Sequence, residues 1–264
     1  MDYLKHYQPR PGFTKISAIG DGGIQLTEFG LVQLAQGAAY AGNTEACETV
    51  LLILGGRCSI RGAGFDFAGL GKRTDVFSGK PHTVYIPRGR EYRIEADTDV
   101  ELAWIAAPSD LDTEAYAITP EQVKAAHIGR DNYQRDAHLV LTDEFPSAHL
   151  FIGEALVPSG NHASYPPHRH DNDNLPVEVD MEEIYFFRFN PEQGYGIQKL
   201  YTDDRSVDFT CTVEQNDTTL LSVGYHPVIN TPGYTMYYLW IMAGRRNRKF
   251  LSVMDPQHAW VASK

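Results

Sequence analysis

The chain has 264 residues, which is enough for one large domain or two domains of about 100–150 residues that bury a core without disulfides. Its three cysteines, Cys47, Cys58 and Cys211, form no CxxC pair, which argues against a disulfide framework and a thiolate zinc site. A net charge of −11 argues against a nucleic-acid partner. The N-terminus lacks a signal-peptide pattern and no apolar run reaches the roughly 20 residues of a membrane span, so we expect a soluble, cytoplasmic protein without membrane contact.

Short runs rich in Val, Ile, Leu, Phe and Tyr, separated by Gly, Pro, Asn and Asp, predict an all-β chain. In the first half the predicted strands cover 48–54, 57–61, 83–87, 91–95 and 100–107. A polar segment follows, in which Thr119 and Pro120 predict the start of a helix and Gly129 its end. In the second half the predicted strands cover 137–142, 149–156, 183–189, 195–201, 218–223 and 235–242. We therefore expect two similar barrels, 1–108 and 137–264, joined by a connecting segment, 109–136.

A pair of similar stretches supports duplication of one barrel. ETVLLILGG (48–56) and EIYFFRFNP (183–191) each place a Glu before an apolar strand, and each is followed by a short strand that ends at a turn, YIPRG (85–89) and LSVGYHP (221–227). Only the second copy keeps histidines at these points. The basic run RRNRK (245–249) is interpreted as a solvated turn and receives no role.

Four residues of the second copy predict a divalent metal site. His168 and His170 are two residues apart, so on an extended strand both imidazoles face the same way. Alternation gives one face of the next strand to Glu183, and His226 arrives from a separate strand. Three imidazoles and one carboxylate suit zinc, manganese, iron, nickel or cobalt. Taken singly, these residues also fit surface histidines, a solvated strand edge at Glu182 and Glu183, or a turn before Pro227.

The motifs HRH (168–170), EEIYFF (182–187) and VGYHP (223–227) resemble the metal motif of the cupin superfamily, in which HxH, a Glu and a final His bind one divalent ion. The resemblance selects Glu183, not Glu182, as the ligand. The segment DNDNLPVEVDME (171–182) departs from the common cupin pattern, which has only three or four residues between HxH and Glu.

This insertion and the stretches 153–171, 182–204, 224–228 and 237–244 resemble the 5-deoxy-glucuronate isomerases of inositol catabolism. The resemblance implies a bicupin, two tandem jelly-roll-like barrels, that converts 5-deoxy-D-glucuronate to 5-dehydro-2-deoxy-D-gluconate. It also implies that the first barrel has lost its metal, with Glu48 remaining where the partner histidines are absent. We expect one divalent ion, zinc before the other metals, and assembly into a homo-oligomer.

An aldose–ketose isomerase moves hydrogen between C2 and C1 as a proton or as a hydride. A proton route needs a base within about 3 Å of C2. The candidates are Tyr185, which shares the face of Glu183, Glu154 in the apolar stretch GEAL, and Tyr225, with Asp203 and Asp204 as weaker choices. The sequence does not rank them.

The carboxylate of a sugar-acid substrate needs a guanidinium or an ammonium group. We expect Lys199 or Arg205 to supply it, because alternation turns Arg188 away from Glu183. Three rival functions share the ligand set: a 4-deoxy-5-hexosulose-uronate ketol-isomerase of pectin breakdown, a cupin dioxygenase, and a sugar-binding cupin without activity.

Overall fold

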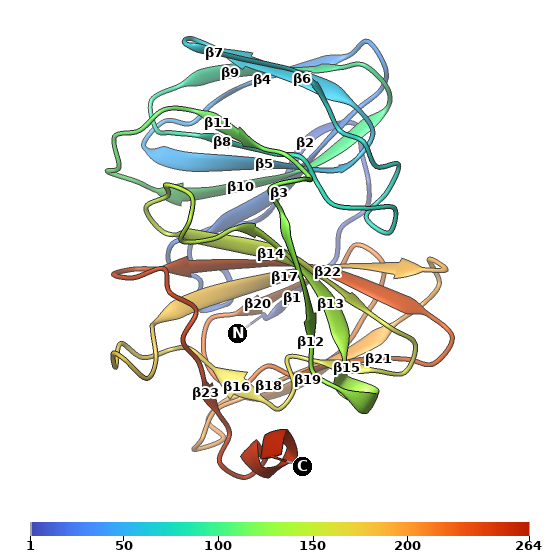
Figure 1. Cartoon of the computed structure of the whole chain (residues 1–264), viewed down its shortest axis with the longest axis vertical. Coiled ribbons are helices and arrows are strands. Elements are labelled where there is room, and N and C mark those ends of the chain that lie inside the picture. The colour runs from blue at the N-terminus through green and yellow to red at the C-terminus, as the bar shows by residue number, and fades with distance from the viewer. Residues whose placement is uncertain (1, 264) are drawn as a thin grey trace.

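The computed structural model describes residues 2–263 and consists of two β-barrels stacked one on the other (Figure 1). In each barrel a large antiparallel sheet faces a four-stranded sheet, which is the jelly-roll arrangement. Within residues 2–263 the only helical elements are three short 3-10 turns, and none of them could cross a membrane: η1(Asp21–Gly23), η2(Asp131–Tyr133) and η3(Ala259–Ser263). The expectation of an all-β bicupin is confirmed.

The first barrel has a six-stranded sheet in the order β11-β8-β5-β10-β3-β2 and a four-stranded sheet in the order β4-β9-β6-β7. The bounds of its strands are β2(Gly12–Ser17), β3(Glu28–Leu34), β4(Ala39–Asn43), β5(Cys47–Gly55), β6(Cys58–Gly62), β7(Phe65–Leu70), β8(Thr83–Ile86), β9(Glu91–Ala96), β10(Val100–Pro108) and β11(Tyr116–Ile118). The strands that precede residue 47 were not predicted from the sequence.

The second barrel has a seven-stranded sheet in the order β1-β20-β17-β22-β14-β13-β12, a four-stranded sheet in the order β15-β21-β18-β19, and the small pair β16-β23. The bounds of its strands are β1(Leu4–Lys5), β12(Lys124–Ile128), β13(Arg135–Leu141), β14(Leu150–Val157), β15(His162–Ala163), β16(His168–Arg169), β17(Met181–Asn190), β18(Gly196–Tyr201), β19(Asp208–Val213), β20(Thr218–Leu221), β21(Val228–Asn230), β22(Thr235–Gly244) and β23(Val253–Met254).

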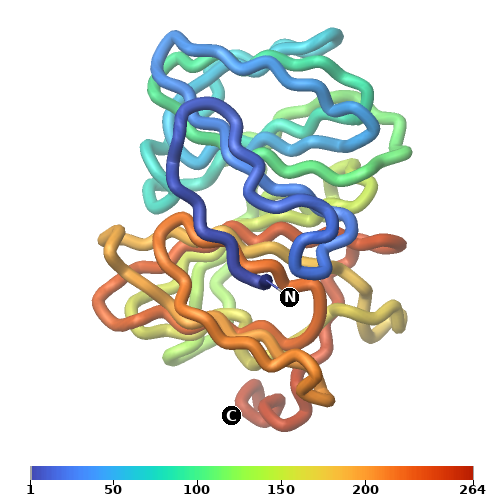
Figure 2. The backbone as a smooth tube through the Cα atoms, turned by 180° about the vertical axis from the view of Figure 1, so that it is seen from behind, coloured from blue at the N-terminus to red at the C-terminus, as the bar shows by residue number. Residues whose placement is uncertain are grey.

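The large sheet of each barrel takes one edge strand from the segment that precedes the other barrel in the chain. β1, near the N-terminus, pairs with β20 of the second barrel, and β11, in the expected connecting segment, pairs with β8 of the first. Figure 2 shows the N-terminal strand lying against the second barrel. β8 pairs with β5 in the first barrel, and β20 pairs with β17 in the second. The two edge strands therefore occupy corresponding positions in the two copies.

The expected helix between Thr119 and Gly129 is wrong. One turn does form at its start, where the amide N–H groups of Gln122 and Val123 donate to the carbonyl oxygen of Thr119. The chain then extends as β12 and pairs with β13. Pairing with the exposed edge of β13 satisfies the backbone groups of this stretch, and this tertiary contact outweighs the weak helical propensity of KAAHI.

The two large sheets pack face to face and bury the largest apolar cluster of the described residues. Val50 and Leu52 of β5 contribute to this interface, as do Ile184 and Phe186 of β17. The residues between them point the other way, into the barrel interiors, which form separate clusters. Strand alternation therefore sends the face of β17 that carries Tyr185 and Phe187 into the second barrel.

A buried carboxylate at the start of each central strand joins the barrels reciprocally. Glu48 of β5 accepts hydrogen bonds from the amides of Ala148, His149 and Leu150 at the start of β14. Glu182 of β17 accepts hydrogen bonds from the amides of Gln25, Leu26 and Thr27 just before β3. Each carboxylate thus accepts hydrogen bonds from backbone amides of the other barrel that would otherwise be buried without a partner.

The pairing register corrects the expected relation between Glu48 and the metal ligand. Glu48 lies opposite Ala107 on β10, and Glu182 lies opposite Ala243 on β22, so Glu48 corresponds to Glu182. Thr49 holds the place that Glu183 holds in the second barrel. Glu48 is thus an interface residue and not the remnant of a metal site, and Glu182 is not the solvated edge residue that the sequence allowed.

Candidate metal centre and cavity

The HxH segment runs along β16, which pairs with β23 near the C-terminus. His168 and His170 lie on one side of this extended segment, and Arg169 between them lies over the ring of Tyr225 at 5.7 Å. His168 Nδ1 is 3.2 Å from the carbonyl oxygen of Pro166, and His170 Nδ1 is 2.7 Å from that of Met181. Both rings are therefore oriented by the backbone.

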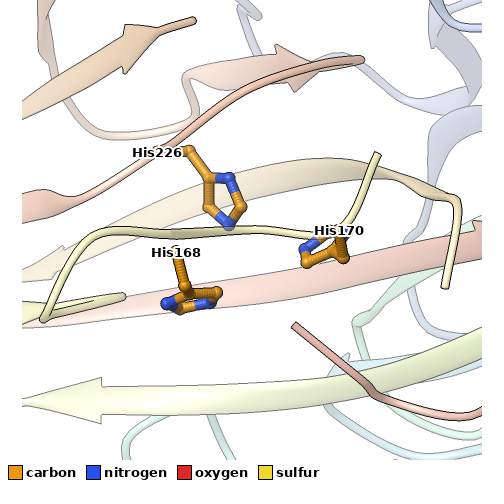
Figure 3. A group of neighbouring side chains, drawn as sticks. All are labelled: His168, His170 and His226. Carbon is orange, nitrogen blue, oxygen red and sulfur yellow. The ribbon is translucent and has the colours of Figure 1, made fainter. Parts of the chain in front are cut away.

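The other two expected ligands come from different elements and meet these histidines. His226 follows β20, and its Nδ1 lies 2.9 Å from the carbonyl oxygen of Gly224. Glu183, on the interior face of β17, places Oε2 3.3 Å from Nε2 of His170 and 3.2 Å from Nε2 of His226. The ligating atoms of the three histidines lie within 4.8 Å of one another, and the three rings gather around one space (Figure 3).

These atoms fit a metal ion. Each Nδ1 faces a carbonyl oxygen, so each ring carries its proton there and turns the lone pair of Nε2 toward the shared space. Nε2 of His170, Nε2 of His226 and Oε2 of Glu183 are buried and make no hydrogen bond. Buried polar atoms are normally paired, and a three-nitrogen, one-oxygen donor set suits a divalent transition metal.

The electrostatics at His168 and Glu183 agree with a ligand set, whereas at His170 burial lowers the pKa but the neighbouring Glu183 outweighs it and raises that pKa. Burial and the neighbouring imidazoles of His226 and His170 lower the pKa of His168 to about 3, which keeps its ring neutral. Burial alone would raise the pKa of Glu183, but His170 and His226 outweigh it and lower that pKa to about 2. Neutral imidazoles and an ionised carboxylate are the protonation states that a metal ion needs.

The insertion after HxH supports the centre. The carboxylate of Asp171 accepts a hydrogen bond from the amide of Gly224 at 2.7 Å, and so ties the HxH segment to the turn that carries His226. Further along the insertion, the amide of Val179 donates to the carbonyl oxygen of Leu251. The segment that departs from the common cupin pattern thus braces both the histidine turn and the C-terminal segment.

A cavity of about 720 Å³ opens over His168 and Glu183. That volume is within the range of about 300–1,000 Å³ that is typical of small-molecule sites. Its walls come from β13, β14, β17 and β22 of the large sheet and from the C-terminal segment, which contributes Phe250, Ser252 and Met254.

Comparisons with known proteins place the chain in a family. The KduI/IolB family matches residues 10–261. This chain belongs to the KduI/IolB family. It is 40% identical over 241 residues to the 5-deoxy-glucuronate isomerase of Geobacillus kaustophilus, covering 90% of this chain and 87% of that protein. A relative of the same name from Bacillus subtilis strain 168 is 38% identical over 243 residues, covering 91% and 89%.

Solved structures agree with this assignment. An IolB-like protein from Salmonella typhimurium LT2 superimposes with a TM-score of 0.95 at 32% identity, covering 99% of this chain and all 100% of that one. An oxalate decarboxylase from Lactobacillus farciminis superimposes with a TM-score of 0.69 at 10% identity, covering 100% of this chain and 91% of that one, which shows a shared fold alone.

Of the three expected acid–base candidates of this KduI/IolB member, only Tyr185 lines the cavity. Its hydroxyl lies 2.6 Å from Oγ of Ser164, and its ring stands 6.0 Å from that of His226 and 4.5 Å from that of Tyr238. Burial raises the pKa of Tyr185 well above its usual value. The phenol therefore keeps its proton beside the metal-binding cluster.

Glu154 lies on the opposite face of β14, between the barrels. Its carboxylate forms a buried, two-point ion pair with Arg73 of the first barrel and accepts a hydrogen bond from Tyr237 at 2.7 Å. Its Oε2 also lies 3.2 Å from Nδ1 of His138. The sequence correctly indicated a buried carboxylate, but alternation along β14 turns it away from the cavity, so the structure does not bring it to the metal cluster.

Tyr225 and the weaker base candidates, Asp203 and Asp204, lie outside the cavity. The hydroxyl of Tyr225 donates to Asp203 at 3.0 Å, and burial raises the pKa of Tyr225 to about 12. Asp204 accepts hydrogen bonds within its own turn from Thr202 and Ser206. None of the three candidates is among the residues that line the cavity.

Of the expected carboxylate-binding residues, Lys199 lies on β18 of the four-stranded sheet and Arg205 lies in the turn between β18 and β19. Lys199 is 2.9 Å from Asp208 in an exposed ion pair, and the guanidinium of Arg205 stacks 4.1 Å above the ring of Tyr201. Neither lines the cavity. Arg188 does face away from Glu183, as alternation predicts, and pairs with Glu101 of the first barrel at 2.6 Å.

Sequence reasoning missed Arg130 and Arg135, which do line the cavity. Arg135 begins β13, where Ala137 and Leu139 share its face and also line the cavity. Alternation from these two apolar residues could have indicated Arg135. Nothing in the local sequence indicated Arg130, because the preceding stretch was interpreted as a helix.

The basic run 245–249 is not simply a solvated turn. The guanidinium of Arg248 donates to the carbonyl oxygens of Thr142, Phe145 and Leu150. It therefore fixes the start of the C-terminal segment against the large sheet, just before Phe250 enters the cavity wall.

Proposed function

We propose that this chain is an aldose–ketose isomerase that converts 5-deoxy-D-glucuronate to 5-dehydro-2-deoxy-D-gluconate in inositol catabolism. The observation that carries the proposal is the cluster of His168, His170, Glu183 and His226, of which His168 and Glu183 line the cavity, in a chain 40% identical to a 5-deoxy-glucuronate isomerase. A cluster that served only to bind sugar would not require three buried ligand atoms without hydrogen-bond partners.

These four residues would hold a divalent ion, and that ion would supply Lewis acidity for polarising a carbonyl group. The chain itself positions the substrate and manages protons. Tyr185, fixed by Ser164 at 2.6 Å, presents a hydroxyl group to the cavity beside Glu183, where it donates a hydrogen bond to a substrate oxygen. The aromatic and apolar lining limits water around the reacting carbons.

Three finer points belong to the same proposal. Zinc is the first choice of metal because three imidazoles and a carboxylate are among its usual ligands. The physiological location is the cytoplasm, where the free thiols of Cys47, Cys58 and Cys211 remain reduced. We also propose a homo-oligomer, which light scattering of the purified protein tests.

The experiment combines turnover with metal analysis of the full chain. Purified protein should contain about one divalent ion per chain and convert 5-deoxy-D-glucuronate to the ketose, followed by NMR. Treatment with a chelator should remove both the ion and the activity, and added zinc should restore them. Tyr185→Phe should keep the metal but reduce kcat by about 10²–10⁴-fold, the usual contribution of a positioned proton donor. Ser159→Ala, in a turn outside the cavity, is the control.

Several results would contradict the proposal. Full activity in metal-free protein would remove the role given to the ion. Preferred turnover of 4-deoxy-5-hexosulose uronate would identify the pectin enzyme, and oxygen consumption with substrate would identify a dioxygenase. Deuterium from solvent at C1 of the product indicates proton transfer, whereas its absence indicates hydride transfer or a shielded proton.

A further inference from the structure

Two arginines form a cationic wall on the side of the cavity built by β13 and the turn before it. Arg130 immediately precedes η2, and Arg135 begins β13. Among the described residues that line the cavity, these two are the only lysines or arginines, and Glu183 is the only carboxylate. Because Glu183 belongs to the metal cluster, nothing acidic remains to neutralise the cationic wall.

Neither arginine makes an ion pair within residues 2–263. Nε of Arg130 donates to the Tyr133 hydroxyl at 2.8 Å, and its Nη2 donates to the carbonyl oxygen of Val261 at 2.9 Å. Nη1 of Arg135 lies 3.4 Å from the carbonyl oxygen of Tyr133, and its guanidinium also interacts with the phenol of Tyr238. Both side chains are half-buried.

This lack of partners is notable in a chain with a net charge of −11. Two other arginines that lie between the barrels have carboxylate partners: Arg73 pairs with Glu154, and Arg188 pairs with Glu101. An unneutralised guanidinium in a cavity wall is a ready binding group for an anion.

The cationic wall is linked to the metal cluster through two tyrosines. Tyr238 lies between them, with its ring 4.5 Å from that of Tyr185. Arg135, Tyr238 and Glu183 all line the same cavity. Burial raises the pKa of the Tyr238 phenol, Arg135 opposes that rise, and Glu183 adds to it, so both charged groups act on this side chain. A ligand in the cavity can therefore contact the cationic wall at one end and the metal cluster at the other.

We propose that Arg135, assisted by Arg130, binds the carboxylate of a sugar acid whose carbonyl end faces the metal cluster. A guanidinium binds a carboxylate through two parallel hydrogen bonds, which fixes its orientation as well as its charge. The substrate named above meets this requirement, so the inference rests on the proposed function for the identity of the ligand. The subsite itself requires only a carboxylate at the far end of a six-carbon sugar.

Binding of two analogues to the metal-loaded full chain tests the subsite by calorimetry. D-glucuronate carries the carboxylate, and D-glucuronamide replaces it with a neutral amide of similar shape. Wild-type protein should bind glucuronate more tightly. Arg135→Gln should weaken glucuronate binding about 10- to 100-fold, as expected for the loss of a charge-assisted pair, and should leave glucuronamide binding within about twofold. Arg135→Lys should give an intermediate loss.

Lys199→Gln is the matched control, because it removes one positive charge outside the cavity. It should leave the binding of both analogues unchanged. Equal losses of glucuronate and glucuronamide in Arg135→Gln would show a structural role and overturn the proposal, as would equal affinity of wild-type protein for the two analogues. If wild-type protein selects glucuronate through Arg135 but does not turn over 5-deoxy-D-glucuronate, the subsite stands and the proposed function fails.

Discussion

The residues around the metal cluster show how adjacent carboxylates acquire different roles. Glu183 points into the second barrel and reaches His170 and His226, whereas Glu182 points out of it and receives amide hydrogen bonds from the first barrel. The two side chains point in opposite directions because residues alternate along β17. Burial does not distinguish them, since both are buried.

This contrast gives a prediction for a matched pair of variants. Glu183→Gln should lower metal affinity by more than the roughly 10–100-fold that follows loss of an outer partner of a ligand. Glu182→Gln should keep the metal but lower the free energy of unfolding by about 1–3 kcal/mol, because an amide group faces backbone donors. Metal analysis and urea unfolding measure the two effects. Loss of metal in Glu182→Gln with retention in Glu183→Gln would reverse the assignment.

Among the elements, the C-terminal segment has the clearest influence on the cavity. Among the contacts that hold it, Arg248 donates to the carbonyl oxygens of Thr142 and Leu150, β23 pairs with β16, and Asp255 accepts a hydrogen bond from Tyr201 at 2.7 Å. The wall formed by Phe250 and Met254 lies between the first and last of these contacts.

Removing the hydrogen bond between Tyr201 and Asp255 should make the cavity wall at Phe250 and Met254 more mobile without changing the expected metal ligands. In Tyr201→Phe we expect hydrogen exchange of residues 250–263 to become about 10- to 100-fold faster, since a hydrogen bond to a charged group is lost. KM should rise while bound metal stays constant. Tyr195→Phe, at an exposed position, is the control. Unchanged exchange in Tyr201→Phe would mean that the remaining contacts hold the segment without this hydrogen bond.

At the scale of the whole molecule, the barrels are joined by a large apolar interface with a charged pair inside it. Burial alone would raise the pKa of Glu154, but Arg73, His138 and Tyr237 outweigh it and lower that pKa below its usual value. A group with a depressed pKa in the folded state stabilises the fold above its unfolded pKa, near 4.5, and this contribution disappears as the pH falls below that value.

Breaking this pair should therefore destabilise the whole chain. Arg73→Met leaves a buried carboxylate unpaired and should lower the free energy of unfolding at pH 7 by about 3–5 kcal/mol. Lys15→Met, which breaks the exposed pair with Glu28, should change it by no more than about 1 kcal/mol. Urea unfolding at pH 7 and across pH 3–5 measures both. In Glu154→Gln the loss of stability below pH 4.5 should be smaller than in the wild type.

The sequence by itself determined the β class, because strand alternation is a local property of the chain, and the resemblance carried by its motifs indicated the family that the comparisons show. The HxH spacing and that resemblance predicted four ligands, whose side chains the structure brings together. The two expected carboxylate-binding residues and the candidates Glu154 and Tyr225 were placed by propensity and chemistry alone, and the structure locates them outside the cavity.

Only the tertiary structure decided which residues face the cavity. A buried face of β14 can point into a barrel or toward the other barrel, and the sequence pattern is the same in both cases. The edge pairing of β12 and the role of Glu48 likewise depend on contacts between segments, such as β13 with β12 and β5 with the start of β14. Such contacts leave no periodic signal in the sequence, because their energy comes from the partner and not from the segment itself.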